Sequence, residues 1–160
     1  MRLLACMSVA VVLLATAPRA PAAPPQGLEP VEGKVIWVDF WASWCVPCRR
    51  SFPWLNAMQE KYGPDGLQII GVNLDKDRAL ADRFLADVPA EFGLRFDPAG
   101  GLATEFGVQA MPSSYLLDHS GRVLATHFGF TTADTANYEQ AIRAALAGQP
   151  ASTATPGARQ

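Results

Sequence analysis

The sequence predicts an α/β protein with a mixed central sheet flanked by helices. Residues 35–41, VIWVDFW, form a nearly continuous run of apolar, β-branched and aromatic residues, typical of a strand covered on both faces. Strand patterns then alternate with helical patterns through residues 33–147, which indicates parallel strands joined by helices. Two late strand patterns flank the turn sequence DHSG at 118–121, which predicts an antiparallel hairpin and so a mixed sheet.

The first half of the chain supplies two helices and a second strand. A helix is expected from about Cys45 to Tyr62, and a buried strand from Leu67 to Leu74. Asp77 can cap a further helix that reaches Val88. The residues expected on the inner faces of these helices are Phe52, Leu55, Met58 and Tyr62 in the first, and Leu80, Ala81, Phe84, Leu85 and Val88 in the second.

The second half closes the sheet. A short strand is expected near residues 94–96 and a short helix near 102–106, followed by hairpin strands at 114–117 and 123–128. The last helix should run from about residue 134 to 147, with Gly148 at its end. Its expected inner residues are Tyr138, Ala141, Ile142, Ala145 and Leu146.

Composition limits the classes of function. The chain has 160 residues, of which 49% are hydrophobic, so it can bury one core of ordinary size. Its net charge of −2 favours neither a nucleic-acid partner nor binding to an anionic membrane surface. No cofactor and no resident metal are expected.

Both ends of the chain differ from the middle. A positive start at Arg2, an apolar run over 3–17 and the small residues of Ala20-Pro21-Ala22 predict a signal peptide over 1–22. The alternative is an uncleaved leader that anchors the protein to a membrane. A Pro- and Ala-rich linker is expected over 23–32, the globular domain over 33–147, and a disordered tail over 148–160.

Cysteine spacing raises the question of function. Removing the leader removes Cys6 and leaves only Cys45 and Cys48, within the stretch WASWCVPCRR. A structural disulfide here would close a loop of about four residues and contribute only roughly 2 kcal/mol. Zinc needs four ligands, and the two histidines, His119 and His127, lie on the distant hairpin without knuckle-like spacing. A redox couple explains more of the surrounding residues.

The redox hypothesis rests on the position of the pair where a strand gives way to a helix. Cys45 is expected to be exposed at the helix start and to face its unpaired N–H groups, which stabilise the attacking thiolate. Cys48, one turn deeper, could resolve a mixed disulfide. Pro47 suits the first turn of a helix. Trp41 and Trp44 are expected to form an apolar collar around the couple.

Asp39 is a second candidate catalytic residue. A carboxyl group inside a strand covered on both faces is costly to ionise, so its pKa should be raised. It precedes the cysteines by one strand-to-helix turn and could exchange a proton with Cys48. The alternative is a carboxylate that reaches solvent near the strand's end.

These motifs resemble the exported TlpA-like, ResA-like and CcmG-like branch of the thioredoxin fold, over residues 33–147. The specific matches are Val38-Asp39-Phe40-Trp41-Ala42 with the following Trp44-Cys45-x-Pro47-Cys48, then Pro53, then Met111-Pro112, then Gly129. The resemblance implies a thioredoxin fold with a helix-strand insertion before a cis proline at Pro112. It also implies that Trp44, Met111, Pro112 and Gly129 contact a substrate peptide, Gly129 by leaving room for it.

The chain also departs from that branch. The glutamate that ResA-like and CcmG-like members carry after the second cysteine is replaced by Ser51. The thioredoxin aspartate that they often lack is kept as Asp39, and the thioredoxin lysine beside that aspartate falls on Gly71. Asp39 is therefore expected to do the proton-transfer work that the relatives give to the glutamate.

The leading functional hypothesis is a periplasmic thiol:disulfide oxidoreductase that reduces protein disulfides through Cys45 and Cys48. The resemblance implies cysteine-containing protein substrates, as in cytochrome c maturation, and a membrane electron donor of the DsbD type. One alternative is a DsbA-like oxidant, against which Val46-Pro47 supplies no histidine to stabilise a thiolate. The other is a copper-binding chaperone that uses the two cysteines and Met111.

Overall fold

A computed structural model describes residue 28 and residues 34–148. Every predicted helix and strand is present, with each bound within one residue of its expected place. The elements are β1 (Val35–Trp41), α1 (Val46–Tyr62), β2 (Leu67–Asn73), α2 (Arg78–Asp87), β3 (Gly93–Phe96), α3 (Gly101–Glu105), β4 (Ser113–Leu117), β5 (Val123–Phe128), the 3-10 turn η1 (Thr132–Asp134) and α4 (Thr135–Leu146).

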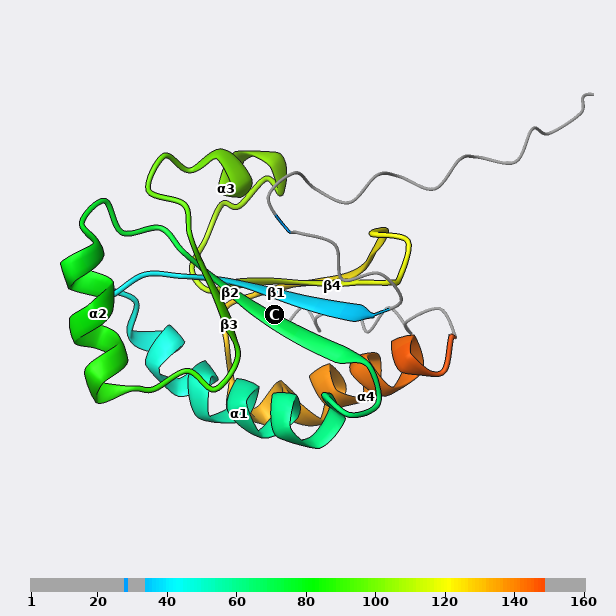
Figure 1. Ribbon diagram of the computed structural model, residues 1–160. Helices are drawn as coiled ribbons and strands as arrows, with labels where there is room; N and C mark the ends of the chain where they lie inside the picture. The colour runs from blue at the N-terminus through cyan, green and yellow to red at the C-terminus, as the bar shows by residue number, and fades with distance from the viewer. Residues whose placement is uncertain (1–27, 29–33, 149–160) are drawn as a thin grey trace, which may run out of the picture.

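The strands form one sheet in the order β3-β2-β1-β4-β5 (Figure 1). β1, β2 and β3 run parallel, whereas β4 is antiparallel to β1 and β5 is antiparallel to β4. The hairpin turn is held by Asp118, whose Oδ1 accepts hydrogen bonds from the N–H groups of Ser120 and Arg122. The expected mixed sheet is therefore confirmed.

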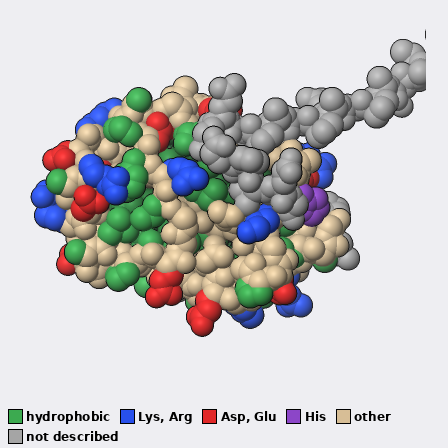
Figure 2. Space-filling model, in the orientation of Figure 1, with side chains coloured by type: hydrophobic (Ala, Val, Ile, Leu, Met, Phe, Trp, Pro, Cys, Tyr) green, Lys and Arg blue, Asp and Glu red, His purple; other side chains and the backbone are tan. Residues whose placement is uncertain are grey.

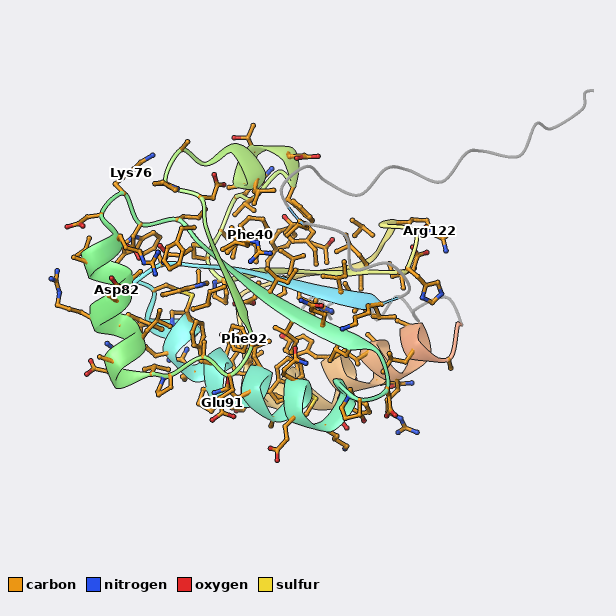
Figure 3. All side chains as sticks on the ribbon, in the orientation of Figure 1. Phe40, Lys76, Asp82, Glu91, Phe92 and Arg122 are labelled. Atoms are coloured by element: carbon orange, nitrogen blue, oxygen red, sulfur yellow. A yellow bond between two sulfur atoms is a disulfide. The ribbon has the colours of Figure 1, made fainter. Side chains whose placement is uncertain are left out.

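The two faces of the sheet have separate cores. On one side β1 contributes Trp37 and Trp41 to a cluster that includes residues of α1, α2 and α4, and on the other it contributes Val38 and Phe40, against which α3 packs. Figure 1 shows α1 and α4 below the sheet and α3 above it. Figure 3 shows Phe40 on the α3 side and Phe92 on the α1 side. β1 is buried along its whole length, as its composition predicts.

The inner faces of α1 and α4 are as expected, and that of α2 differs at one position. In α2, Ala81 and Phe84 are buried, but Leu80 is 37% exposed, so its predicted place in the core is wrong. Leu85 and Val88 pack against the core from partly buried positions. A ten-residue helix at the end of the sheet buries only a narrow stripe, and Leu80 is rotated by about 100° from Ala81 around the helix axis.

The predicted signal peptide at 1–22 lies outside the described residues, as do most of the linker at 23–32 and the tail beyond Gly148. Leu28 is the exception within the linker: it is buried and belongs to the core cluster on the α3 side of the sheet, which also contains Ile36 and Leu117. Across residue 28 and residues 34–148, no helix has the length and hydropathy needed to cross a bilayer. Lys, Arg, Asp and Glu side chains are interspersed over the face drawn in Figure 2.

Candidate redox site

The two cysteines lie at the start of α1. Cys45 is the N-cap residue, with an extended backbone (φ −83°, ψ 99°), and its Sγ accepts a hydrogen bond from the backbone N–H of Cys48 at 3.2 Å. Pro47 occupies the first turn, where a missing N–H costs no intrahelical hydrogen bond. The N–H of Cys48, which has no partner within the helix, thus points at the Cys45 sulfur. This hydrogen bond favours negative charge on that sulfur when the pair is reduced.

Cys45 and Cys48 are joined by a disulfide bond. Cys48 is fully buried, and Cys45 is 3% exposed. The sequence led us to expect an exposed Cys45, whereas in the oxidised form it offers solvent only a small part of its surface. Of the two, only Cys45 keeps any exposed surface.

A buried carboxylate holds the loop between β1 and α1. The Oδ2 atom of Asp75 accepts from the backbone N–H of Ser43 at 2.9 Å, and Oδ1 accepts from the Ser43 hydroxyl at 2.8 Å. The Nδ2 of Asn73 donates to Asp75 Oδ2 at 2.7 Å. This role was not predicted from the sequence. The available signal was that Asn73 and Asp75 come at the end of β2, beside the end of the parallel strand β1.

The two tryptophans of the motif lie in different environments. Trp41, the last residue of β1, is fully buried and packs against Phe52 and Phe84, with ring centroids 5.1 and 4.8 Å apart. Trp44, in the following turn, is 68% exposed. The expected collar of both rings is therefore wrong, because the strand directs Trp41 inward and the turn directs Trp44 toward solvent.

Asp39 faces the same side of the sheet as Trp37 and Trp41, which is the side covered by α1. It is 1% exposed, so the alternative of a carboxylate that reaches solvent is wrong. Burial raises its pKa to about 7, against the opposing effect of a hydrogen bond from Ser114. The Ser114 hydroxyl donates to Oδ1 at 2.6 Å, and Oδ2 has no hydrogen-bond partner within the described part of the chain.

Gly71 lies directly across from Asp39 on β2. A Cβ atom at this position would meet the Phe92 ring at 2.9 Å and the Trp41 Nε1 at 3.1 Å. The space that a lysine would need is thus filled by aromatic side chains. Hydrophobic packing beside Asp39 replaces the cation of the thioredoxin pattern, which leaves desolvation as the main influence on its pKa.

The peptide bond between Met111 and Pro112 is cis. Phe40 pairs with Ser113, so Pro112 lies beside the end of β1, near the start of the loop that carries Cys45. Met111 packs against the hydrophobic cluster that contains both cysteines. The N–H of Gly129 donates to the Pro112 carbonyl at 2.8 Å.

Gly129 has φ +77°, and a Cβ there would meet no atom within 4 Å. The left-handed backbone therefore explains the glycine at least as well as the need to leave room, which was the reason that the resemblance implied. This conformation allows the chain to leave β5 while it keeps the hydrogen bond to Pro112.

Polar groups near the cysteines in α1 are directed elsewhere. Ser51, where relatives carry a glutamate, is buried and its hydroxyl donates to the Cys48 carbonyl at 3.0 Å. Arg49 lies over the Phe84 ring and pairs with Asp87 on α2 at 3.3 Å. Pro53 lies within α1.

In residue 28 and residues 34–148, no three His, Cys, Asp or Glu side chains gather as a metal site.

The cysteine pair lies at the N-terminus of the helix that follows a central strand, and a cis proline lies near it in a mixed five-stranded sheet. This combination defines a protein of the thioredoxin fold with a redox-type dithiol. The chain belongs to the Redoxin family, whose model matches residues 24–142.

Two curated relatives indicate the branch of this family. The chain is 30% identical to the thiol-disulfide oxidoreductase ResA of Bacillus thuringiensis over 97 residues, 61% of this chain and 56% of ResA. It is 36% identical to the thiol:disulfide interchange protein HelX of Rhodobacter capsulatus over 104 residues, 64% of this chain and 57% of HelX. It therefore spans little more than half the length of these curated relatives.

A solved structure is similar over more of the chain. A crystal structure from Chlorobium tepidum, assigned as a thiol:disulfide interchange protein DsbE, has 52% sequence identity and a TM-score of 0.71. The match covers 72% of this chain and 82% of that one. The recognition of the ResA-like and CcmG-like branch from the sequence is thus confirmed.

Proposed function

We propose that this protein is a thiol:disulfide oxidoreductase that acts through Cys45 and Cys48. The observation that carries the proposal is the disulfide at the N-terminus of α1, in which Cys45 alone keeps some exposed surface and its sulfur accepts the Cys48 N–H. The names of the similar proteins ResA, HelX and DsbE describe the same chemistry.

The reaction begins with the reduced protein and a disulfide in a protein substrate. The Cys45 thiolate attacks one substrate sulfur and forms a mixed disulfide, and the other substrate sulfur leaves as a thiolate that takes up a proton. Trp44 and Met111, with the backbone at Pro112 and Gly129, are the proposed contacts of the substrate chain. Their places around the loop and the cis proline support this proposal.

The second half of the reaction releases the substrate. Cys48 gives its proton to the Oδ2 of Asp39, and its sulfur attacks that of Cys45. This step forms the internal disulfide and expels the second substrate thiolate, so two electrons pass to the substrate in all. A pKa of about 7 lets Asp39 accept a proton at neutral pH and later return it to solvent.

We propose further that the protein works as an exported reductant in the periplasm. A membrane donor of the DsbD type would then reduce the internal disulfide after each turnover, and oxidised cysteines of proteins such as apocytochromes would be the substrates. The apolar Val46 and Pro47 between the cysteines support the direction, because neither side chain stabilises a thiolate.

The test is reduction of a disulfide-containing peptide by the dithiol form under stoichiometric conditions. Transfer of two electrons per protein, lost in Cys45→Ser, is expected. The reverse reaction, rapid oxidation of peptide thiols by the disulfide form with little reduction by the dithiol, would favour a DsbA-like oxidant. Stoichiometric binding of copper(I) by the reduced protein, lost in Met111→Ala, would favour the copper chaperone.

A further inference from the structure

Four residues form one row across the sheet beneath α1. Gly71 of β2 pairs with Asp39 of β1, Asp39 pairs with Ser114 of β4, and Ser114 pairs with His127 of β5. Their side chains lie on the same face, since Trp37, Ile69 and Leu116, two residues away on β1, β2 and β4, all belong to the core cluster on that side. Ser114 is thus the direct neighbour of Asp39 in this row.

Ser114 is a buried residue with one hydrogen bond to give. It is 5% exposed, and its hydroxyl donates to Asp39 Oδ1 at 2.6 Å. A serine hydroxyl has a single proton, so the whole donor capacity of Ser114 is used on this carboxyl group. A bond to a charged acceptor is stronger than one to a neutral acceptor, and it stabilises the carboxylate in a site where water cannot.

The two carboxyl oxygens of Asp39 are therefore not equivalent. Oδ1 is held by Ser114, whereas Oδ2 is buried and has no hydrogen-bond partner among the described residues. An unpartnered carboxylate oxygen is costly in a buried site, and a catalytic role is one explanation for keeping it. On this side of the sheet α1 places the thiol that the proposed reaction must deprotonate.

From this arrangement we infer that Ser114 is a positioning residue of the redox site: its hydroxyl binds Oδ1 of Asp39, stabilises the carboxylate form and leaves Oδ2 to accept the proton of Cys48. The inference rests on the proposed function, because it assigns the orientation of the group that accepts the Cys48 proton. Ser114 does not touch the reacting sulfur and acts only through Asp39.

The titration of Asp39 must be distinguished from that of other groups nearby. At the start of α1 the nearby titratable groups are Cys45 and Cys48. On β2 the residue beside Asp39 is Gly71, which has no titratable group, and on β5 His127 pairs with Ser114. The His127 ring stacks on Trp37 and packs against Tyr138 of α4. Burial lowers the pKa of His127, opposed by the charge of Asp134.

The experiment compares Ser114→Ala with Ser114→Thr, which keeps the hydroxyl. The rate at which Cys48 resolves a preformed mixed disulfide on Cys45 is measured from pH 5 to pH 9. Loss of a hydrogen bond to a charged group should move the Asp39 inflection upward by about one pH unit in Ser114→Ala, which slows release about five-fold at pH 7 and little at pH 9. Ser114→Thr should restore the wild-type profile.

Two control substitutions remove a polar group near Ser114 that makes no hydrogen bond to Asp39. Ser113→Ala deletes a buried hydroxyl that donates instead to the Ala110 carbonyl, on the neighbouring position of β4. His127→Phe keeps a ring against Trp37 and removes the imidazole. Both should leave the inflection in place.

Direct titration of the Asp39 carboxyl carbon by NMR, assigned with Asp39→Asn, separates the two proposals. An unchanged midpoint in Ser114→Ala, or an equal slowing of release at every pH, would overturn the positioning role. A raised midpoint without any change in the release rate would also overturn it, since the bond would then serve no proton transfer. If Asp39→Asn itself releases substrate at the wild-type rate, the proposed function of Asp39 fails instead.

Discussion

Ser43 donates two hydrogen bonds to the carboxylate of Asp75, one from its backbone N–H to Oδ2 at 2.9 Å and one from its hydroxyl to Oδ1 at 2.8 Å. The two residues are 32 positions apart in the chain. Asp75 is 5% exposed and also accepts from Asn73. The loop that precedes Cys45 is thus tied to the end of β2, which fixes where α1 and its cysteines begin.

Asp75→Ala should destabilise the folded protein by about 2–3 kcal/mol, because three donors lose a largely buried charged acceptor. Urea unfolding of the disulfide-bonded form measures this. Asp77→Ala is the matched control: it removes an exposed N-cap of α2, whose side chain accepts from the Ala79 N–H, and should cost about 1 kcal/mol. Equal losses in both variants would contradict the structural role of Asp75.

The order of elements could be predicted because each pattern is local. β1 is apolar except for Asp39 and buried throughout, and α1 buries the four residues that its spacing predicts. Leu80 shows the limit: its spacing fits the inner face of α2, but whether it is covered depends on how far the helix extends past the sheet. That distance is set by tertiary packing and leaves no mark in the local pattern.

The candidate site was predictable to a similar degree. The cysteine spacing, Pro47 and the buried position of Asp39 follow from the sequence, because a strand-to-helix junction constrains all of them. The Asp75–Ser43 and Ser114–Asp39 contacts join residues 32 and 75 positions apart, and only the pairing of strands brings them together. Trp44 was misplaced because a turn residue has no periodicity from which its direction can be inferred.

Cys48→Ser should accumulate covalent complexes with protein substrates, and Cys45→Ser should not. The reason is that Cys45 alone keeps exposed surface, while Cys48 has none. Non-reducing gel electrophoresis after incubation with a disulfide-bonded protein detects the complexes, and the double variant is the control for adventitious thiols. Trapping by Cys45→Ser instead would reverse the assignment of the two thiols.

Asp39→Asn should stabilise the protein at pH 8 and have little effect near pH 4. The pKa of Asp39 is raised from 3.8 to about 7 in the folded protein, so folding favours the protonated form. The contribution of Asp39 to the stability of the wild type is therefore greatest below pH 4 and falls as the pH rises toward 7. Above pH 7 this contribution no longer changes with pH. The full difference corresponds to about 4 kcal/mol as an upper limit.

Urea unfolding of the oxidised form at pH 4, 6 and 8 measures this dependence. Asp65→Asn, at an exposed position between α1 and β2, is the matched control and should show no pH-dependent gain. A gain for Asp39→Asn that is the same at pH 4 and pH 8 would show that Asp39 does not titrate between these values.

The reduction potential of the Cys45–Cys48 couple should lie below roughly −200 mV, nearer thioredoxin than DsbA. A couple becomes oxidising when its reduced form is strongly stabilised, and three features limit that stabilisation. Val46 and Pro47 carry no charge, Arg49 is paired with Asp87, and an ionised Asp39 beneath the couple repels a thiolate.

Equilibration with glutathione or dithiothreitol measures this potential, with tryptophan fluorescence as the signal, since Trp41 packs in the same core cluster as both cysteines. Val46→His tests the cause. It places an imidazole at the exposed first residue of α1, and its protonated form beside the Cys45 thiolate should raise the potential by about 30 mV for each tenfold stabilisation of the reduced form. Val123→His, also at an exposed position but on the distant hairpin, should leave it unchanged. A wild-type value near −120 mV, that of DsbA, would overturn the reductant assignment while the fold and the disulfide remain as described.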